Sequence, residues 1–356
     1  MDESGTRRAA RAHADALTPA ADSPAGAGRV DIGVCRSLRI TCISETGWHD
    51  TGALLGDIKA AGGMQANQWE TAWQPGNGAG SASLIEIEAV DGRGYRILLD
   101  TGWDPDYMAE RFAATGVDAL LRRGEIDLLL VSHEHFDHFW GLEAVLRLRP
   151  DIAIALPASL RDEGRAFLRG GAFTPAGARN GIAHTGRLLW HGADEVHRLA
   201  DGVAAVAFDL PIALGVRGEQ SLYVNVAGKG IVCITGCCHQ GVERFVQFAR
   251  DRLAGGERLH GLYGGLHLAP FGPLDDAAQT AIRNLAGYGF ERIACNHCTG
   301  AAAVEKMIEL GYPVVCGSGG SGSAGERYVG NGDRLHFGCG IEDATTRAAS
   351  RCTNRR

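Results

Sequence analysis

Four side chains of the kinds that bind metal ions lie within six residues of one another in the first half of the chain. They are His133, His135, Asp137 and His138. Imidazole and carboxylate are the usual nitrogen and oxygen ligands of zinc, and of iron or manganese in harder sites. This stretch therefore predicts a metal site.

The spacing of these residues favours two neighbouring ions. His133 and His135 are two positions apart, so on an extended segment they face the same way and can bind one ion. Asp137 and His138 follow where the chain turns into the next element, and they can present to a second ion beside the first. A single histidine after a strand is more often a packing or surface residue, but four ligand types in this register make that alternative weak.

Strands and helices alternate around the metal-binding stretch. The apolar run 126–131 predicts a buried strand, and the helix-like run 140–146 follows the histidines. Residues 83–90 alternate apolar and polar side chains, as a half-buried strand does. Residues 242–253 and 276–285 have the pattern of helices. This periodicity by itself indicates a mixed α/β class.

A second motif lies upstream, where the apolar run 97–99 ends in Asp100, Thr101 and Gly102. Together with the histidine stretch it resembles the metallo-β-lactamase-fold metallohydrolase superfamily, over about residues 38–338. The resemblance implies a four-layer αββα sandwich of the metallo-β-lactamase type. It also implies that Asp100 orients a metal ligand without binding metal itself.

Two later histidines complete the ligand sets in this interpretation. Residues 230–236 read as a strand that ends just before Cys237 and His239, and we assign His239 to the ion of the first histidine pair. A further apolar approach leads to His297, the best candidate for the second ion. Many members of the superfamily place a bridging aspartate in the region of Cys237. Here either the Cys237 thiolate coordinates or a water alone bridges, so we expect one or two ions.

Three short motifs resemble one subgroup of the superfamily. They are Gly-Cys-x-His at 236–239, Gly-Gly-Leu-His at 264–267 and His-Cys-Thr-Gly at 297–300. The subgroup is named for 7,8-dihydropterin-6-methyl-4-(β-D-ribofuranosyl)aminobenzene-5′-phosphate synthase, and many of its members are hydrolases. The glycines before His267 suggest a short strand with close backbone approach. For His267, substrate contact or proton transfer and a structural role stay open, and we count it with Asp137 as a catalytic candidate.

The two ends of the chain differ from its middle. Residues 1–28 are rich in small and polar residues without apolar periodicity, which predicts a disordered tail, and residues 341–356 are assigned to a C-terminal tail. The motifs between them draw on both halves of one domain, so we expect one catalytic domain over 29–340. The sequence shows neither an apolar export signal nor a membrane-spanning run. Most of its ten cysteines are expected to be free. Together these features favour a cytoplasmic location.

Charge helps to select partners. The net charge is −7 and no dense run of Lys and Arg occurs, so long nucleic acids are poor candidates. We expect a small-molecule substrate and no membrane partner. Residues 160–200 could form a wall of the pocket or a dimer contact, so a homodimer stays open.

The glycine-rich segment 47–80 carries Trp48, Trp69 and Trp73 between two predicted strands. Aromatic side chains in a long loop can close over a flat ligand, or they can pack over the edge of a sheet. Because the superfamily that this chain resembles places substrate loops there, we favour the lid.

A hydrolase is the function that this ligand pattern and resemblance imply. A bound ion lowers the pKa of water and polarises a carbonyl or phosphoryl group. The expected substrate is a small ester, lactone, amide or phosphoester, with pterin-like and phosphorylated compounds included. Zn2+ is the expected ion, with Mn2+ or Fe2+ as alternatives. Two rivals stay open: an iron-dependent oxidoreductase, and a metal-containing ligand-binding or regulatory protein with little turnover.

Overall fold

The computed structural model describes residues 28–173 and 177–338. The predicted N-terminal tail, apart from Gly28, and the predicted C-terminal tail lie outside the described residues. The strands are β1 (Cys35–Ser44), β2 (Ala82–Ala89), β3 (Gly94–Leu99), β4 (Leu128–Leu130), β5 (Ile154–Pro157), β6 (Ala172–Phe173), β7 (Arg179–Asn180), β8 (Leu188–His191), β9 (Val196–Ala200), β10 (Val203–Pro211), β11 (Arg217–Val226), β12 (Gly230–Thr235), β13 (Leu259–Gly265), β14 (Arg292–Asn296) and β15 (Arg334–Gly338).

The helices connect these strands. The α-helices are α2 (Thr51–Ala60), α3 (Pro105–Thr115), α4 (Val117–Arg122), α5 (Phe136–Phe139), α6 (Leu142–Leu146), α7 (Asp162–Leu168), α8 (Val242–Arg252), α9 (Asp276–Asn284) and α10 (Ala301–Glu309), with 3-10 turns η1 (Ala213–Gly215), η2 (Leu285–Tyr288) and η3 (His297–Thr299). The helix predicted over 276–285 is confirmed as α9, where Asp275 caps the first turn by accepting from the Ala278 amide. The helix predicted over 242–253 is confirmed as α8.

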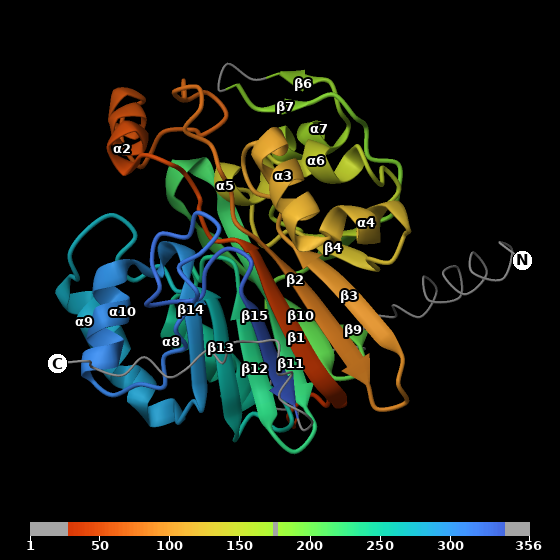
Figure 1. The fold of residues 1–356 in the computed structure, drawn as a ribbon, viewed down its shortest axis with the longest axis vertical. Coiled ribbons are helices and arrows are strands. Elements are labelled where there is room, and N and C mark those ends of the chain that lie inside the picture. The colour runs from red at the N-terminus through yellow and green to blue at the C-terminus, as the bar shows by residue number, and fades with distance from the viewer. Residues whose placement is uncertain (1–27, 174–176, 339–356) are drawn as a thin grey trace, which may run out of the picture.

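Strands run through the middle of the molecule, with α3, α4, α6 and α7 on one side and α8, α9 and α10 on the other (Figure 1). The main strand order is β14-β13-β12-β11-β1-β2-β3-β4-β5-β8, with β10 on β11 and β15 on β1. Strand β1 joins the two halves, since it pairs antiparallel with β2 and meets β11 at Cys35 and Val226. The mixed α/β class is confirmed.

Three apolar cores separate four layers, two of strands and two of helices. Side chains alternate along each strand, so neighbouring residues of one strand belong to different cores. In β4, Leu129 packs with helices α3 to α7, whereas Leu128 and Leu130 face the second sheet. In β11, Tyr223 packs with helices α8 to α10, whereas its neighbour Leu222 faces the first sheet. Successive strand residues point to opposite faces, so a doubly covered strand must be apolar on both. This is the αββα arrangement that the sequence resemblance implies.

Parallel pairing brings the site-bearing strand ends to one edge. Strand β3 is parallel to β4, and β12, β13 and β14 are parallel to one another. The carboxyl ends of parallel strands meet at the same edge of a sheet, which is where open α/β folds place their ligands. Each predicted site residue lies in the short stretch of chain that follows the carboxyl end of one of these strands.

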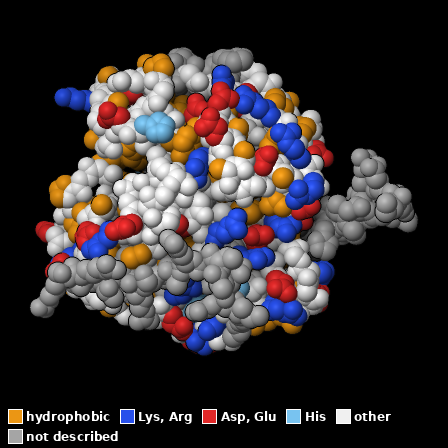
Figure 2. Space-filling model, viewed as in Figure 1, with side chains coloured by type: hydrophobic (Ala, Val, Ile, Leu, Met, Phe, Trp, Pro, Cys, Tyr) orange, Lys and Arg blue, Asp and Glu red, His pale blue; other side chains and the backbone are white. Residues whose placement is uncertain are grey.

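Three further features concern helix hydrophobicity, surface charge and the state of the cysteines. Within the described ranges, no helix has the length and apolar character needed to cross a bilayer. On the face shown in Figure 2, Lys and Arg side chains lie among Asp and Glu side chains. Ion pairs occur among the described residues, such as that of Arg123 with Glu125. Free, buried cysteines are Cys35, Cys42, Cys233, Cys237, Cys238, Cys295 and Cys298, whereas Cys316 is disulfide-bonded.

Candidate metal centre

Three histidines converge at the end of β4 and β12. His133 Nε2 lies 3.0 Å from His135 Nδ1, and the His239 ring centroid is 4.7 Å from that of His133 and 5.0 Å from that of His135. We call these residues the three-histidine set. Burial lowers the pKa of His133 and brings the pKa of His135 to about 3. Neutral imidazoles are what metal coordination requires.

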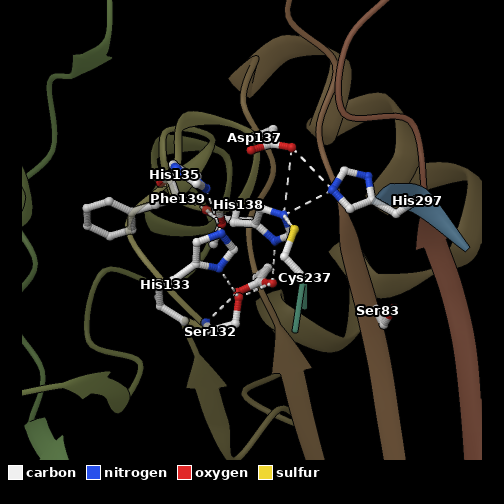
Figure 3. A network of polar contacts seen from close by, with 12 residues as sticks. Ser83, Ser132, His133, His135, Asp137, His138, Phe139, Cys237 and His297 are labelled. Atoms are coloured by element: carbon white, nitrogen blue, oxygen red, sulfur yellow. Dashed lines mark hydrogen bonds and ion pairs between the residues drawn. The ribbon is translucent and has the colours of Figure 1, made fainter. Parts of the chain in front are cut away.

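A second set, composed of Asp137, His138 and His297, lies beside the first (Figure 3). We call it the aspartate set. His138 Nε2 and Asp137 Oδ2 are each 3.2 Å from His297 Nε2, and Cys237 Sγ lies 3.1 Å from His138 Nε2. Burial alone would raise the pKa of Asp137, but His138 and His297 bring it below its usual value. The carboxylate is therefore ionised.

Every histidine of the two sets is fixed from behind by an oxygen. The outward nitrogens of His133, His138 and His239 contact Ser132 Oγ at 2.9 Å, Asp100 Oδ2 at 2.7 Å and Glu219 Oε2 at 2.9 Å. Those of His135 and His297 contact the carbonyl oxygens of Ala213 at 3.0 Å and Glu45 at 2.9 Å. Because a neutral imidazole has one N–H, a donor on the outside leaves a lone pair on the inside.

The inward nitrogens fit a metal ion better than they fit one another. Two facing lone pairs cannot form a hydrogen bond, and His239 Nε2 is buried with no hydrogen-bond partner at all. Ligand atoms around a tetrahedral zinc ion with bonds of about 2.0–2.1 Å are about 3.3 Å apart, close to the 3.0 Å and 3.2 Å separations here. The donor chemistry thus matches one divalent ion per set.

Asp100 lies behind the ligands, as the sequence resemblance implies. Its carboxylate accepts hydrogen bonds from the Ser132 amide at 2.6 Å and the Ser132 hydroxyl at 2.7 Å, besides the contact to His138. It is 1% exposed and has a φ of 64°, an uncommon backbone angle for a residue other than glycine. One carboxylate thereby connects the two sets, through Ser132 to His133 and directly to His138.

Glu219 is a site residue that the sequence analysis missed. Its buried carboxylate accepts from the backbone amides of Cys237, Cys238 and His239 at 2.7–2.9 Å, and from His239 Nδ1. Burial alone would raise its pKa, but these hydrogen bonds, with that of His239 first, lower it to about 2. Strand β11 also carries Arg, Gln, Ser and Asn side chains, so no local pattern singled out this carboxylate.

Gln68 is a second missed residue, from the loop between α2 and β2. Its side chain is fully buried, donates to the Glu134 carbonyl at 2.7 Å and accepts from the Phe136 amide at 2.9 Å. The two backbone groups flank His135 on either side. A single amide therefore holds the backbone that carries this ligand.

Replacing Gln68 with alanine is expected to lower the affinity of the three-histidine set for its ion by about 10-fold, and the free energy of unfolding by about 1–3 kcal/mol. Both effects follow because two buried backbone groups beside His135 lose their partner. Metal competition titration and urea unfolding measure them. The matched control is Gln74→Ala, an exposed residue of the same loop. Equal metal affinity in Q68A and Q74A would contradict the positioning role.

Gly47 lets the loop after β1 approach the aspartate set. A Cβ at this position would lie 2.8 Å from both Asp137 Oδ2 and His297 Cε1, closer than such atoms pack. Its φ lies outside the left-handed region, so the requirement is for space alone. Within that loop, Trp48 lies 6.1 Å from the His297 ring and 5.6 Å from Phe271, between ring centroids.

Gly47→Ala is expected to weaken metal binding by the aspartate set by about 10-fold, because the added methyl displaces Asp137 or His297 from its position. Gly56→Ala on α2 is the control, since a Cβ there meets nothing within 4 Å. Metal titration of the two variants, followed by activity, distinguishes them. If G47A binds both ions with wild-type affinity, the close approach has no consequence.

The lid interpretation of the tryptophan segment is wrong for two of its three residues. Trp69 is 3% exposed and packs against Trp140, and Trp73 is 9% exposed and packs against Phe136. Their large apolar area stabilises the core between the first sheet and its helices. Trp48 alone of the three borders the aspartate set.

His267 lies at the site but not in a strand. Strand β13 ends at Gly265, so the short strand expected around His267 is wrong, whereas the close backbone approach is found: a Cβ at Gly265 would lie 2.6 Å from the Gly236 carbonyl oxygen. The His267 ring centroid is 4.5 Å from that of His239. Its φ of 46° is strained for histidine, and strain of this kind is concentrated at functional sites.

The chain belongs to the metallo-beta-lactamase superfamily, whose family model matches residues 75–297, more than half of the sequence. Proteins of this superfamily are generally metal-dependent hydrolases. The fold and the clustered ligands agree with this membership.

Individual relatives are more distant. A curated relative from Methanocaldococcus jannaschii, 7,8-dihydropterin-6-methyl-4-(beta-D-ribofuranosyl)-aminobenzene-5'-phosphate synthase, is 24% identical over 65% of this chain and 84% of its own. A solved metal-dependent hydrolase of the beta-lactamase superfamily aligns over 85% of this chain and 100% of its own, with a TM-score of 0.52 and 18% identity. Zn(2+)-bound PqqB from Methylobacterium extorquens covers the same shares, with a TM-score of 0.47 and 12% identity.

Proposed function

We propose that this protein is a metal-dependent hydrolase that uses a metal-activated water on a small ester, lactone, amide or phosphoester. The observation that carries the proposal is the orientation of five histidines, three of them buried and two half-buried. Each has an oxygen partner on its outward nitrogen, and each inward nitrogen faces the other ligands. The inward nitrogen of His239 has no hydrogen-bond partner, and a buried polar atom of this kind costs stability unless an ion binds it. We propose residues 29–340 as the catalytic domain.

We propose Zn2+ as the resident ion, in one or both sets. The three-histidine set offers three imidazoles, a ligand combination that suits zinc in catalytic sites. The aspartate set, with one carboxylate, also accommodates Mn2+ or Fe2+. Cys237 lies within reach of both sets, and its thiolate would favour zinc over the harder ions.

Bound ions of this class lower the pKa of water and polarise a substrate oxygen. The protein groups then divide the remaining work. The ionised Asp137 can accept a hydrogen bond from the attacking water and so orient it. His267, whose ring centroid lies 4.5 Å from that of His239, is our candidate for proton donation to the leaving group when its imidazole carries no ion.

A small, flat substrate suits the border of this site. Trp48 and the partly exposed Phe271 form an aromatic pair next to His297. Aromatic rings of this kind stack on planar groups. The similarity to the archaeal pterin-phosphate synthase adds a pterin-like compound to the substrates worth testing. Arg93 and Arg123, close to the site motifs in sequence, are paired with Asp91 and Glu125, so neither supplies a free phosphate-binding group.

The test is reconstitution. The full chain is stripped with a chelator, reloaded with Zn2+, Mn2+ or Fe2+ in separate samples, and assayed on a lactone, a carboxylic ester, a phosphodiester and a phosphorylated pterin. We expect hydrolysis of at least one substrate that depends on added metal. Turnover that is unchanged by complete metal removal would refute the proposal.

A further inference from the structure

A third group of metal-ligand types lies beside the two sets and has no part in the proposed reaction as a group. Cys237, His267 and Cys298 each offer one ligand atom, and these three atoms lie within 4.8 Å of one another. Both cysteines are buried, whereas His267 is exposed at residue level. The group therefore has a sulfur-lined base and an open side.

Three adjacent parallel strands bring the group together. Cys237 follows β12, His267 follows β13 and Cys298 follows β14, so each residue comes from a different strand end. This makes the arrangement a product of the sheet itself, which holds its ligands more rigidly than a loop would.

Two backbone features keep the space between these side chains clear. A Cβ at Gly265 would lie 2.6 Å from Cys298 Sγ, so a glycine is needed for the sulfur to sit there. His267 has its φ of 46° although asparagine or glycine would adopt that angle more readily. Backbone strain of this kind is concentrated at functional sites.

We propose that Cys237, His267 and Cys298 form a third cation subsite that binds a soft ion. Two sulfurs and one imidazole are ligands that select Zn2+ and other thiophilic ions over Mn2+ or Mg2+. Ligand atoms around such an ion are about 3.3–3.8 Å apart, given metal–sulfur bonds of about 2.3 Å, which the observed cluster accommodates. The exposed side leaves a fourth position open to solvent or ligand.

Cys237 connects the subsite to the aspartate set. Its sulfur is 3.1 Å from His138 Nε2 and lies within 4.8 Å of ligand atoms from both other sets. A thiolate has several lone pairs and can bridge two ions. The third subsite would therefore bind an ion only if Cys237 is one of its ligands. An ion found there would show that the Cys237 sulfur binds metal.

Cadmium titration of the full chain, stripped of metal, tests the subsite through a signal independent of turnover. Cd2+ bound by thiolate gives an ultraviolet charge-transfer absorption, which counts the sulfur ligands. We expect the wild-type chain to bind one more equivalent of Cd2+ than of Mn2+. In Cys298→Ser that additional equivalent is lost, and the absorption falls by roughly half because the Cys237 thiolate still binds the cadmium ion of the aspartate set.

Two further variants keep the test decisive. His267→Asn removes the imidazole but suits the left-handed backbone, so it should fold and still lose the additional cadmium ion. Cys295→Ser, which replaces another buried cysteine on β14, should retain it. Wild-type cadmium stoichiometry and absorption in both C298S and H267N would overturn the proposal. A wild-type chain that binds equal numbers of Cd2+ and Mn2+ would overturn it as well.

Discussion

Replacing His135 with alanine is expected to remove the ion of the three-histidine set and to lower kcat/KM by roughly 10³-fold or more, the scale seen when one member of a catalytic unit is deleted. His135 supplies Nδ1 at 3.0 Å from His133 Nε2, and its other nitrogen is fixed by the Ala213 carbonyl. Elemental analysis of the purified variant, followed by steady-state kinetics, measures both effects.

The matched control is His49→Ala, which removes an exposed histidine that contacts Tyr107 and lies in the loop between β1 and α2. It should retain metal and activity. A His135→Ala protein that keeps its full metal content and turns over at the wild-type rate would show that the three-histidine set is assigned incorrectly.

Glu219→Gln is expected to have the second-largest effect, although Glu219 contacts the outward nitrogen of His239 and binds no ion itself. The carboxylate accepts five hydrogen bonds, from three backbone amides, from Thr235 and from His239 Nδ1. Glutamine replaces one carboxylate oxygen with an NH2 group, which cannot accept a hydrogen bond from the N–H and O–H groups that face it. We expect the free energy of unfolding to fall by about 3 kcal/mol, since several buried N–H groups lose an acceptor at about 1–3 kcal/mol each.

The same change should weaken metal binding by about 10–100-fold, because the Glu219 carboxylate fixes the tautomer of His239 and raises its basicity as a ligand. Urea unfolding of the metal-free chain separates the structural loss from the loss of metal affinity. Glu88→Gln, at an exposed ion pair of β2, is the control. Wild-type zinc affinity in E219Q would contradict the proposed orientation of His239.

The parts of the site that could be predicted from sequence are those whose residues lie in short, contiguous motifs. Residues 133–138 carry four ligands in one turn of chain, and each of His239 and His297 follows its own apolar strand. Strand periodicity also predicts which face is buried, so the class of fold followed from short windows of sequence. The structure brings all six of these predicted ligands to one edge of the sheets.

The parts that could not be predicted depend on contacts between distant segments. Gln68 holds the backbone around His135 from 67 positions away, Gly47 packs against Asp137, and Glu219 organises the turn before His239. None of these has a local pattern that differs from an ordinary loop or strand residue. Trp69 was misassigned for the same reason, since an aromatic residue in a glycine-rich segment can pack inward or outward, and only the tertiary structure decides.

Metal analysis of the full chain, purified without added metal and assayed for hydrolysis and oxygen uptake in the same sample, tests the central claim most directly. We predict near-stoichiometric zinc or manganese, with hydrolysis and no oxygen consumption. Near-stoichiometric iron, accompanied by oxygen consumption and no hydrolysis, would contradict the account and favour an oxidoreductase built on the same ligands.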